Sequence, residues 1–502
     1  MILFCVVRDL YPEINNELVK ENPHAVDIDT ISSSIALYGK SNRLKLYTHS
    51  QHQTDFDHCI INGNTQNYRK PYKYKIKIDE EPKYKFINTA FIFKDKLKEL
   101  GEESAAELIN YLFNQVKIIR IDCKNREFAI KLFQVLNDRG MDLTAADLIK
   151  SFLIEQLYKQ HGGDPDIAKQ KEEQFISDWR EMEQNIKDLD ITLNDLFFIY
   201  AYYLLNKRPR KSINEELHNE FERGDSNKII GDMKKFAYEY KTEIWDSKDV
   251  GVYSFWYIKW SIYWKAILLT SIHTNYPHFK EIVYELRRFY YLYWIAGKTL
   301  SQIKQTSFNL IKWIKDKKPI KEIQSELNDK IESDGIVKQA LESLKDNYVS
   351  SAAWCKPLLI LLEYNSTDNT NYGFIPLSRD LHLEHIIPRE CGKHEEWSHI
   401  TDEIKNDWLE RFGNLTLLSG TKNIEASNNP FDVKMAVYRG KGKYDNKNDK
   451  VTAFQITQSI VNDFDSNKYN KEWNERSAID RWNWFVDEVQ KLLDIDTSTI
   501  KR

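Results

Sequence analysis

The sequence predicts an α+β protein that is predominantly α-helical, with its few strands near the two ends of the chain. Apolar residues recur at helical spacing through most of residues 160–350. Residues 72–78 instead alternate polar and apolar side chains, with the period of a half-exposed strand. After Asp380 the pattern changes to short strands and loops, and a helix is expected from about Pro430 to Tyr438.

The composition is that of a globular protein with an aromatic-rich core. The 502 residues are enough for roughly two to four domains. Hydrophobic residues make up 41% and charged residues 29%, and the 13 Trp, 28 Tyr and 24 Phe favour packed helices over disorder. The net charge of −4 gives no global nucleic-acid signature, so a polyanion would have to bind local basic patches.

Cysteine usage and the apolar runs predict a cytoplasmic protein without a membrane span. The 5 cysteines include no Cys-x-x-Cys pair, which argues against a zinc ribbon and against a disulfide framework. The run Met1–Val7 lacks basic residues before it and a cleavage site after it, so a helix is expected rather than an export signal. The run Val252–Ile272 carries Lys259 and Lys265, which favours a buried helix of a water-soluble protein.

A strand, a helix, a turn and a second helix are expected in succession between residues 118 and 152. Residues 118–121 have the pattern of a short buried strand, and 126–136 present one apolar helical face. The helix is expected to break at 137–140, and Thr144 or Asp142 to cap the next one. From the residues alone, a well-formed turn is the favoured interpretation.

The middle of the chain contains two aromatic runs and two basic joints. Residues 196–205 and 289–294 are apolar nearly all round, as in helices buried on several sides. Such rings stack bases in some proteins, but core packing is the favoured explanation. The joints are Lys207–Lys211 and Lys317–Pro319.

The residues with the clearest chemistry lie between 382 and 438. Glu384 and His385 stand side by side at the expected end of a strand, and Asn414 lies at a turn into the apolar run Leu-Thr-Leu-Leu. Histidine suits the deprotonation of water near neutral pH, and a hard divalent cation prefers oxygen ligands. Asn423 is placed to return to a metal, and Lys434 to bind a phosphate. The set predicts a phosphodiesterase site.

This order of parts is that of the HNH, or ββα-metal, nucleases. A lone Glu-His pair is usually structural, whereas the ordered set with its spacing is considerably more specific. Other chemistries fit less well: His394 and His399 are one residue too far apart for a zinc-protease helix, and no Gly-x-Ser-x-Gly elbow is present. Gly39-Lys40-Ser41 lacks the first glycine of a phosphate-binding loop.

Several motifs resemble GmrSD-type restriction endonucleases. Residues 383–388, 413–418, Ser427-Asn428 and the Phe431-x-x-Lys434-x-x-x-Tyr438 pattern resemble their C-terminal nuclease domain. Residues 133–150 resemble the later part of their ParB-like N-terminal domain. The resemblance implies that His385 is the general base, that Glu384 and Asn423 lie near the metal, and that Asn414 orders the fold.

The complete set of candidate residues follows from the chemistry and the resemblance together. We expect His385, Asn414 and Lys434 to act in catalysis, and Glu384, Asn423, Asn428 and His382 to hold the metal. The resemblance also implies four segments: a partial ParB-like domain (1–160), a helical domain (161–350), an HNH-like nuclease domain (351–450) and its helical extension (451–502).

One departure concerns the N-terminal domain of that family, which carries an Asp-Gly-Gln-Gln-Arg signature and uses nucleoside triphosphate. No such sequence is present, and Met1–Tyr11 resembles the helix that should follow it. We expect that the missing part precedes Met1, comes from a partner subunit, or has been lost together with nucleotide use.

The predicted function is that of a cytoplasmic DNA endonuclease dependent on Mg²⁺ or Mn²⁺, which restricts modified or phage DNA in prokaryotic defence. Two alternatives stay open. One is a non-catalytic or truncated subunit that binds DNA or a partner, and the other is an RNA-cleaving toxin.

Overall fold

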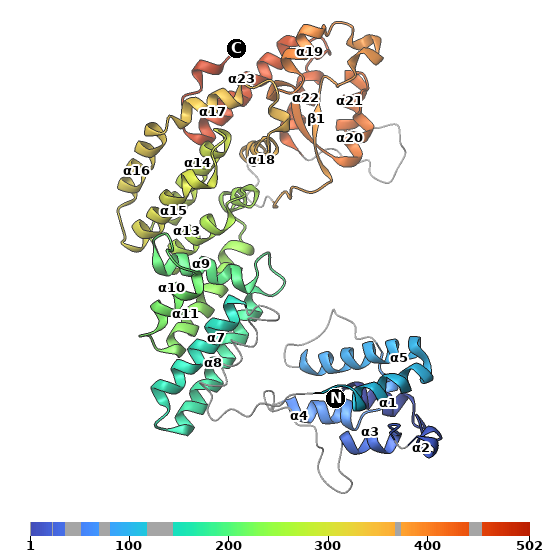
Figure 1. Cartoon of the computed structure of the whole chain (residues 1–502). Helices are drawn as coiled ribbons and strands as arrows, with labels where there is room; N and C mark the ends of the chain where they lie inside the picture. Colours follow the sequence, from blue (N-terminus) through green and yellow to red (C-terminus); the bar gives the residue numbers. More distant parts are fainter. Residues whose placement is uncertain are drawn as a thin grey trace. The chain divides into compact units, whose positions relative to one another are not determined.

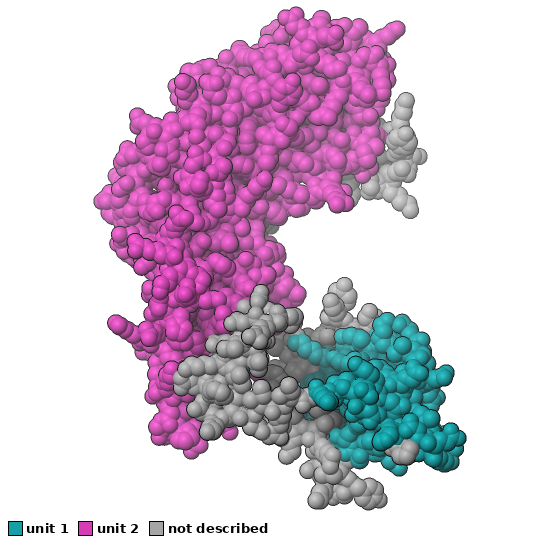
Figure 2. Space-filling view, in the orientation of Figure 1, with its two compact units in different colours: residues 1–123 teal, residues 124–502 magenta. Residues whose placement is uncertain are grey.

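A computed structural model describes residues 2–22, 24–35, 52–69, 81–117, 144–366, 373–440 and 454–502. The chain forms two compact units, residues 1–123 and 124–502 (Figure 2). Three segments considered in the sequence analysis lie outside the described residues: the predicted strand 72–78, the segment 39–41 and the predicted strand–helix–turn region 118–140.

The described part of the first unit is helical. It contains α1 (Ile2–Leu10), α2 (Leu18–Glu21), α3 (Ile28–Ile35), α4 (Gln53–Phe56), a π-helical turn (Asp57–Ile61) and α5 (Glu81–Asn114). The apolar N-terminal run therefore forms a helix, as predicted. Val6 and Val7 of α1 are fully buried with Ile31 of α3, and α1 also packs against α5. The long α5 kinks at Gly101, whose φ of 80° suits a residue without a Cβ.

The second unit continues as a series of packed helices before its small sheet (Figure 1). These are α7 (Ala145–His161), α8 (Pro165–Ile186), α9 (Leu193–Leu205), α10 (Ile213–Phe221), α11 (Ser226–Glu239), α12 (Val250–Tyr253), α13 (Ser261–His273), α14 (Phe279–Ile295), α15 (Leu300–Lys315), α16 (Ile320–Ser333), α17 (Ile336–Leu344) and α18 (Cys355–Asn365). The prediction of helices across 160–350 is confirmed. One hydrophobic core of described residues extends from Ala146 to Ile500.

Local signals in the second unit behave as the sequence indicates. Thr144, rather than Asp142, caps α7: its hydroxyl accepts from the Asp147 backbone, and the Asp147 carboxylate accepts from the Thr144 backbone. The aromatic run at 289–294 lies in α14, where Tyr290 and Tyr291 are fully buried. Core packing, not base stacking, explains that run.

The run Val252–Ile272 is not one continuous helix. The chain breaks between a 3₁₀ turn (Ser254–Tyr257) and α13, and Lys259 is exposed at this break. Lys265 is buried, but its Nζ lies 2.5 Å from Asp190 Oδ2, so the buried charge is compensated. Across the described ranges, no helix combines the length and apolarity that crossing a membrane requires.

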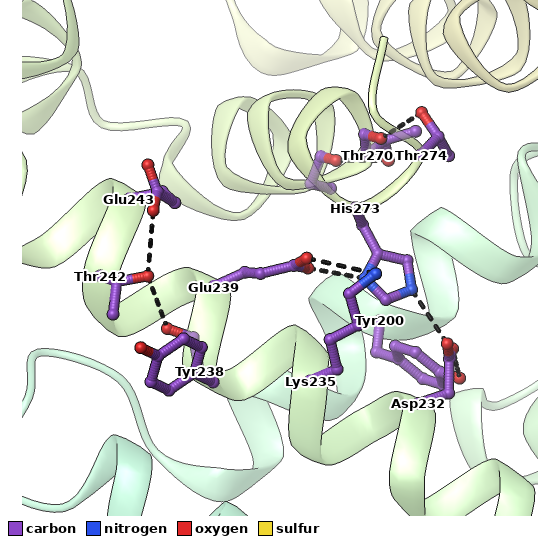
Figure 3. Close-up of polar contacts among 11 residues, drawn as sticks. Tyr200, Asp232, Lys235, Tyr238, Glu239, Thr242, Glu243, Thr270, His273 and Thr274 are labelled. Atoms are coloured by element: carbon purple, nitrogen blue, oxygen red, sulfur yellow. Dashed lines mark hydrogen bonds and ion pairs between the residues drawn. The ribbon is translucent and has the colours of Figure 1, made fainter.

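A buried histidine ties α13 to α11 (Figure 3). His273 Nδ1 lies 2.6 Å from Glu239 Oε2, and Nε2 lies 3.1 Å from Asp232 Oδ1. Tyr200 of α9 donates to the other oxygen of Asp232 at 2.7 Å. Although burial opposes the charged ring, the two carboxylates raise the pKa of His273 to about 9. The cluster is therefore a charged link among three helices.

The C-terminal part of the second unit contains a two-stranded antiparallel sheet (Figure 1). Its elements are β1 (Leu381–His385), α19 (Asp402–Trp408), β2 (Leu415–Ser419), α20 (Gly420–Ala426), α21 (Phe431–Tyr438), α22 (Gln455–Asp465) and α23 (Glu475–Leu493). The predicted helix at 430–438 is confirmed as α21. Buried Glu363 of α18 accepts from the Gln455 and Ile456 backbone at 2.8 and 3.0 Å, which satisfies the N-terminus of α22. The fold is α+β and predominantly helical.

Candidate active site

The pairing of β1 with β2 decides where the candidate side chains point. Glu384 faces Thr416 across the ladder, and His385 faces Leu415. Because successive strand residues project from opposite faces, Glu384 and His385 point to different sides of the sheet. His382 shares the face of Glu384. The adjacent acid and imidazole therefore have separate surroundings.

Glu384 forms a buried ion pair with α21. Its Oε1 accepts from Lys434 Nζ at 2.7 Å and from Tyr438 Oη at 3.0 Å. Lys434 Nζ also donates to the His385 carbonyl at 2.6 Å, and the Lys434 side chain has no exposed surface. Burial lowers the pKa of Lys434, an effect that the Glu384 carboxylate opposes.

This position differs from the expectation that Lys434 binds a phosphate. A fully buried ammonium with two hydrogen-bond acceptors anchors α21 to the end of β1 and cannot reach a substrate. Glu384 retains one candidate ligand atom. Both of its hydrogen bonds fall on Oε1, and no described residue donates to Oε2.

His385 pairs with a carboxylate that sequence reasoning did not single out. Its Nε2 lies 2.9 Å from Glu410 Oε2, and the two side chains are 15% and 16% exposed. The described residues provide no partner for the other ring nitrogen, Nδ1. An ionised Glu410 accepts the proton of Nε2 and so selects the tautomer with a free lone pair on Nδ1. Glu410 thereby fixes the orientation of the imidazole.

Three groups hold Glu410 in its ionised form. The hydrogen bond with His385 is the main reason that the pKa of Glu410 falls to about 2, with smaller contributions from Ser350 and Arg389. The Ser350 hydroxyl donates to Glu410 Oε2, and the Ser350 backbone donates to the Glu410 carbonyl at 3.1 Å. Arg389 lies 3.1 Å from Oε1, yet 64% of its side chain is exposed.

Glu410 and Arg389 are the residues that sequence analysis missed. Both are ordinary charged residues in irregular segments, and only the strand register brings them to His385. Because His385 pairs with Leu415, the residues just before Leu415 lie next to the imidazole. The pairing of His385 with Leu415 is the signal that identifies Glu410, and the sequence alone does not show this register.

Asn414 occupies the position predicted for it. Its Oδ1 accepts from the Ile387 backbone at 2.6 Å, and its Nδ2 donates to the carbonyls of Ile387 and Leu409 at 3.1 Å each. The Ile386 backbone adds a bond to the Asn414 carbonyl at 3.0 Å. The side chain is fully buried, so Asn414 joins the segment after β1 to the segment that carries Glu410 and does not face a substrate.

The remaining candidates lie around α20. The Asn423 side-chain oxygen is buried and has no hydrogen-bond partner among the described residues, so its lone pairs are available to a ligand. A Cβ added to Gly420 would lie 3.3 Å from His382 Nε2, so His382 packs against the start of α20. Asn428 instead donates to Glu390 Oε2 at 3.0 Å on the exposed surface.

These positions allow a test of the fit to a divalent cation. Within the described ranges, no three His, Cys, Asp or Glu side chains come together as a metal cluster. Glu384 Oε2 and Asn423 Oδ1 are oxygens without a described partner, which is the donor type that Mg²⁺ and Mn²⁺ prefer. The chemistry of these two oxygens suits such a cation, whereas the His385 side chain lies on the other face of the sheet from Glu384.

Comparison with known proteins gives one match. Residues 331–487 match the family model described as GmrSD restriction endonucleases, C-terminal domain. Searches of curated proteins and of solved structures returned no match. The matched segment contains both strands, α19 to α22, and the pair His385–Glu410. Residues 331–487 of this chain are therefore similar to the C-terminal domain of GmrSD restriction endonucleases.

Proposed function

We propose that this chain is a metal-dependent DNA endonuclease in which His385 is the general base. The observation that carries the proposal is the His385–Glu410 pair, inside the segment that matches a restriction endonuclease domain. Glu410 fixes the imidazole through Nε2 and leaves Nδ1 to take a proton from water. The resulting hydroxide attacks the scissile phosphorus, and the bond to the leaving oxygen breaks.

Arg389 is the proposed phosphate contact, in place of Lys434. Its guanidinium touches Glu410 on one side and is otherwise exposed, so it can bind a phosphate oxygen beside the base. Lys434 has a positioning role: it holds the carbonyl of His385 and the carboxylate of Glu384 against α21.

Glu384 Oε2 and Asn423 Oδ1 are the protein oxygens that would hold a divalent cation in this proposal. When bound, Mg²⁺ or Mn²⁺ would neutralise charge on the phosphate and the leaving oxygen. Neither His382 nor Asn428 is needed in this arrangement. Asn414 acts through the two segments it joins, so it is a positioning residue rather than a catalytic one.

The biological role proposed for this activity is restriction of modified or phage DNA in prokaryotic defence, in the cytoplasm. The family match supports the restriction role. A ParB-like function of the N-terminal region, nucleoside triphosphate use, and a partner subunit that supplies a missing part belong to the same proposal. Their support is the resemblance of residues 133–150.

Incubation of the purified chain with supercoiled DNA tests the activity. With Mg²⁺ or Mn²⁺ we expect nicked and linear products, and none with EDTA. Modified and unmodified DNA, together with RNA of matched length, should be compared in parallel. Preferential cleavage of RNA would favour the toxin alternative, and binding without cleavage under every metal would favour the non-catalytic alternative.

A further inference from the structure

The loop between α9 and α10 concentrates positive charge at the protein surface. It contains Lys207, Arg208, Arg210 and Lys211 on either side of Pro209. All four cationic side chains are exposed, and none forms an ion pair with a described residue. In a chain with a net charge of −4, four free cations within five residues are a local exception.

Two carboxylates at the start of α10 accept hydrogen bonds from the loop. Glu216 Oε1 accepts from the backbone of Arg210 at 2.8 Å and of Lys211 at 3.1 Å. Glu215 Oε2 accepts from the backbone and hydroxyl of Ser212, which closes the capping box of α10. The backbone hydrogen bonds, helped by the nearby charges of Lys207 and Lys211, lower the pKa of Glu216, but neither lysine forms an ion pair with a described residue and both side chains are exposed.

The same contacts fix the path of the loop. It begins at Asn206, whose φ of 44° ends α9 in the left-handed conformation, and it ends at the cap Ser212. Pro209 restricts the backbone in between. Lys315 of α15 donates to the carbonyls of Tyr203 and Leu204 at 2.8 and 2.9 Å, which adds a cation beside the end of α9.

The second basic joint of the chain, Lys317–Pro319, provides a comparison. Lys317 Nζ donates to the Thr274 carbonyl, and Lys318 Nζ lies 2.8 Å from Glu326 Oε1. Both lysines therefore have partners within the fold, although the joint also contains a proline. The cationic side chains at 207–211 differ because none of them forms a hydrogen bond or an ion pair with a described residue.

We infer that residues 207–211 form a contact surface for the phosphate backbone of DNA, separate from the candidate active site. Fixed, closely spaced and unpaired Lys and Arg side chains bind phosphates and release the counterions condensed on the duplex. The choice of DNA as the polyanion rests on the proposed function. Backbone contacts carry no sequence information, so this surface supplies affinity and orientation rather than specificity.

The test is the salt dependence of DNA binding by the full chain. A fluorescently labelled duplex is titrated in EDTA, which prevents metal-dependent cleavage, at several NaCl concentrations. The variant carries K207Q, R208Q, R210Q and K211Q, which keep every backbone hydrogen bond of the loop. A matched control carries K280Q, K321Q, K338Q and K345Q, four exposed lysines scattered over α14, α16, α17 and the turn after α17.

If each loop cation contacts one phosphate, the slope of log K against log salt becomes shallower by about 0.9 per cation removed. The affinity ratio between wild type and loop variant then shrinks about 150-fold between 50 and 200 mM salt. The control should keep the wild-type slope. An unchanged slope in the loop variant, or an equal loss in the control, would overturn the inference.

Two further outcomes separate this inference from the proposed function. Loop-dependent binding by a chain that cuts no DNA under any metal would leave the inference standing and remove the endonuclease proposal. Efficient DNA cleavage by the wild type, together with DNA binding by the loop variant that equals wild type at every salt concentration, would support the endonuclease proposal and overturn the inference. Loop-dependent binding to vesicles of anionic lipid, with none to DNA, would overturn the choice of partner.

Discussion

Replacing Glu410 by Gln tests how His385 is activated. The pKa of Glu410 falls from 4.5 to about 2, mainly because of its hydrogen bond with His385. That difference corresponds to about 3 kcal/mol of preference for the ionised carboxylate at this position. Gln keeps the shape and the bond with Ser350, but its amide can also donate to Nε2. The proton would then move to Nδ1, where it blocks the base.

We expect E410Q to lower the single-turnover rate of DNA cleavage about 10²- to 10⁴-fold, the usual contribution of a general base. Substrate binding should change little, because the substitution leaves Arg389 exposed. The double variant E410Q/H385A should be no slower than H385A, since the two residues act as one unit. E396Q, at an exposed carboxylate of the same domain, is the matched control.

The assay is cleavage of supercoiled DNA at saturating enzyme, with Mg²⁺, across a range of pH. Thermal unfolding of each variant shows whether the fold is retained. An E410Q rate within threefold of wild type would refute the proposed orientation of His385. So would a double variant that is slower than H385A by the full factor of E410Q.

Three other substitutions test the surrounding structure. K434M should destabilise the chain by about 3–5 kcal/mol in denaturant unfolding, because Glu384 is left buried and unpaired; K434M/E384Q should recover part of the loss. An equal loss in both variants would contradict the buried pair. N414A should cost about 3 kcal/mol and reduce cleavage, since it removes three buried hydrogen bonds. Wild-type stability after N414A would rule out its positioning role. The pKa of His273 is raised to about 9, so its stabilisation is complete below pH 6.5 and is lost as pH rises through 9. Wild type should lose about 3 kcal/mol relative to H273Q over that range, and parallel pH curves would contradict the charged link.

The sequence predicted the parts of the site that depend on local pattern. An apolar strand with alternating polar residues places His385 at its end, and the Gly-Asn turn identifies Asn414 as a residue that bridges the backbone. The capping box at Thr144 and the helix at 431–438 are local signals of the same kind. Each of these depends on residues within a few positions of one another.

The parts of the site that the sequence did not predict depend on contacts between residues that are far apart in the chain. Glu410 reaches His385 only because β1 and β2 pair in one register. Lys434 was expected to bind phosphate because the sequence does not show which side of α21 faces the sheet. Lys265 was correctly expected inside a buried helix, but its partner Asp190 lies 75 residues away in the sequence.

The most direct test of the central claim compares H385A with H394A in the cleavage assay. His394 lies in the same domain, and no described side chain bonds its ring. With Mg²⁺ or Mn²⁺, the proposal predicts that wild type and H394A cut DNA at similar rates, while a folded H385A protein does not cut. Cleavage by H385A at the wild-type rate would show that His385 is not the general base.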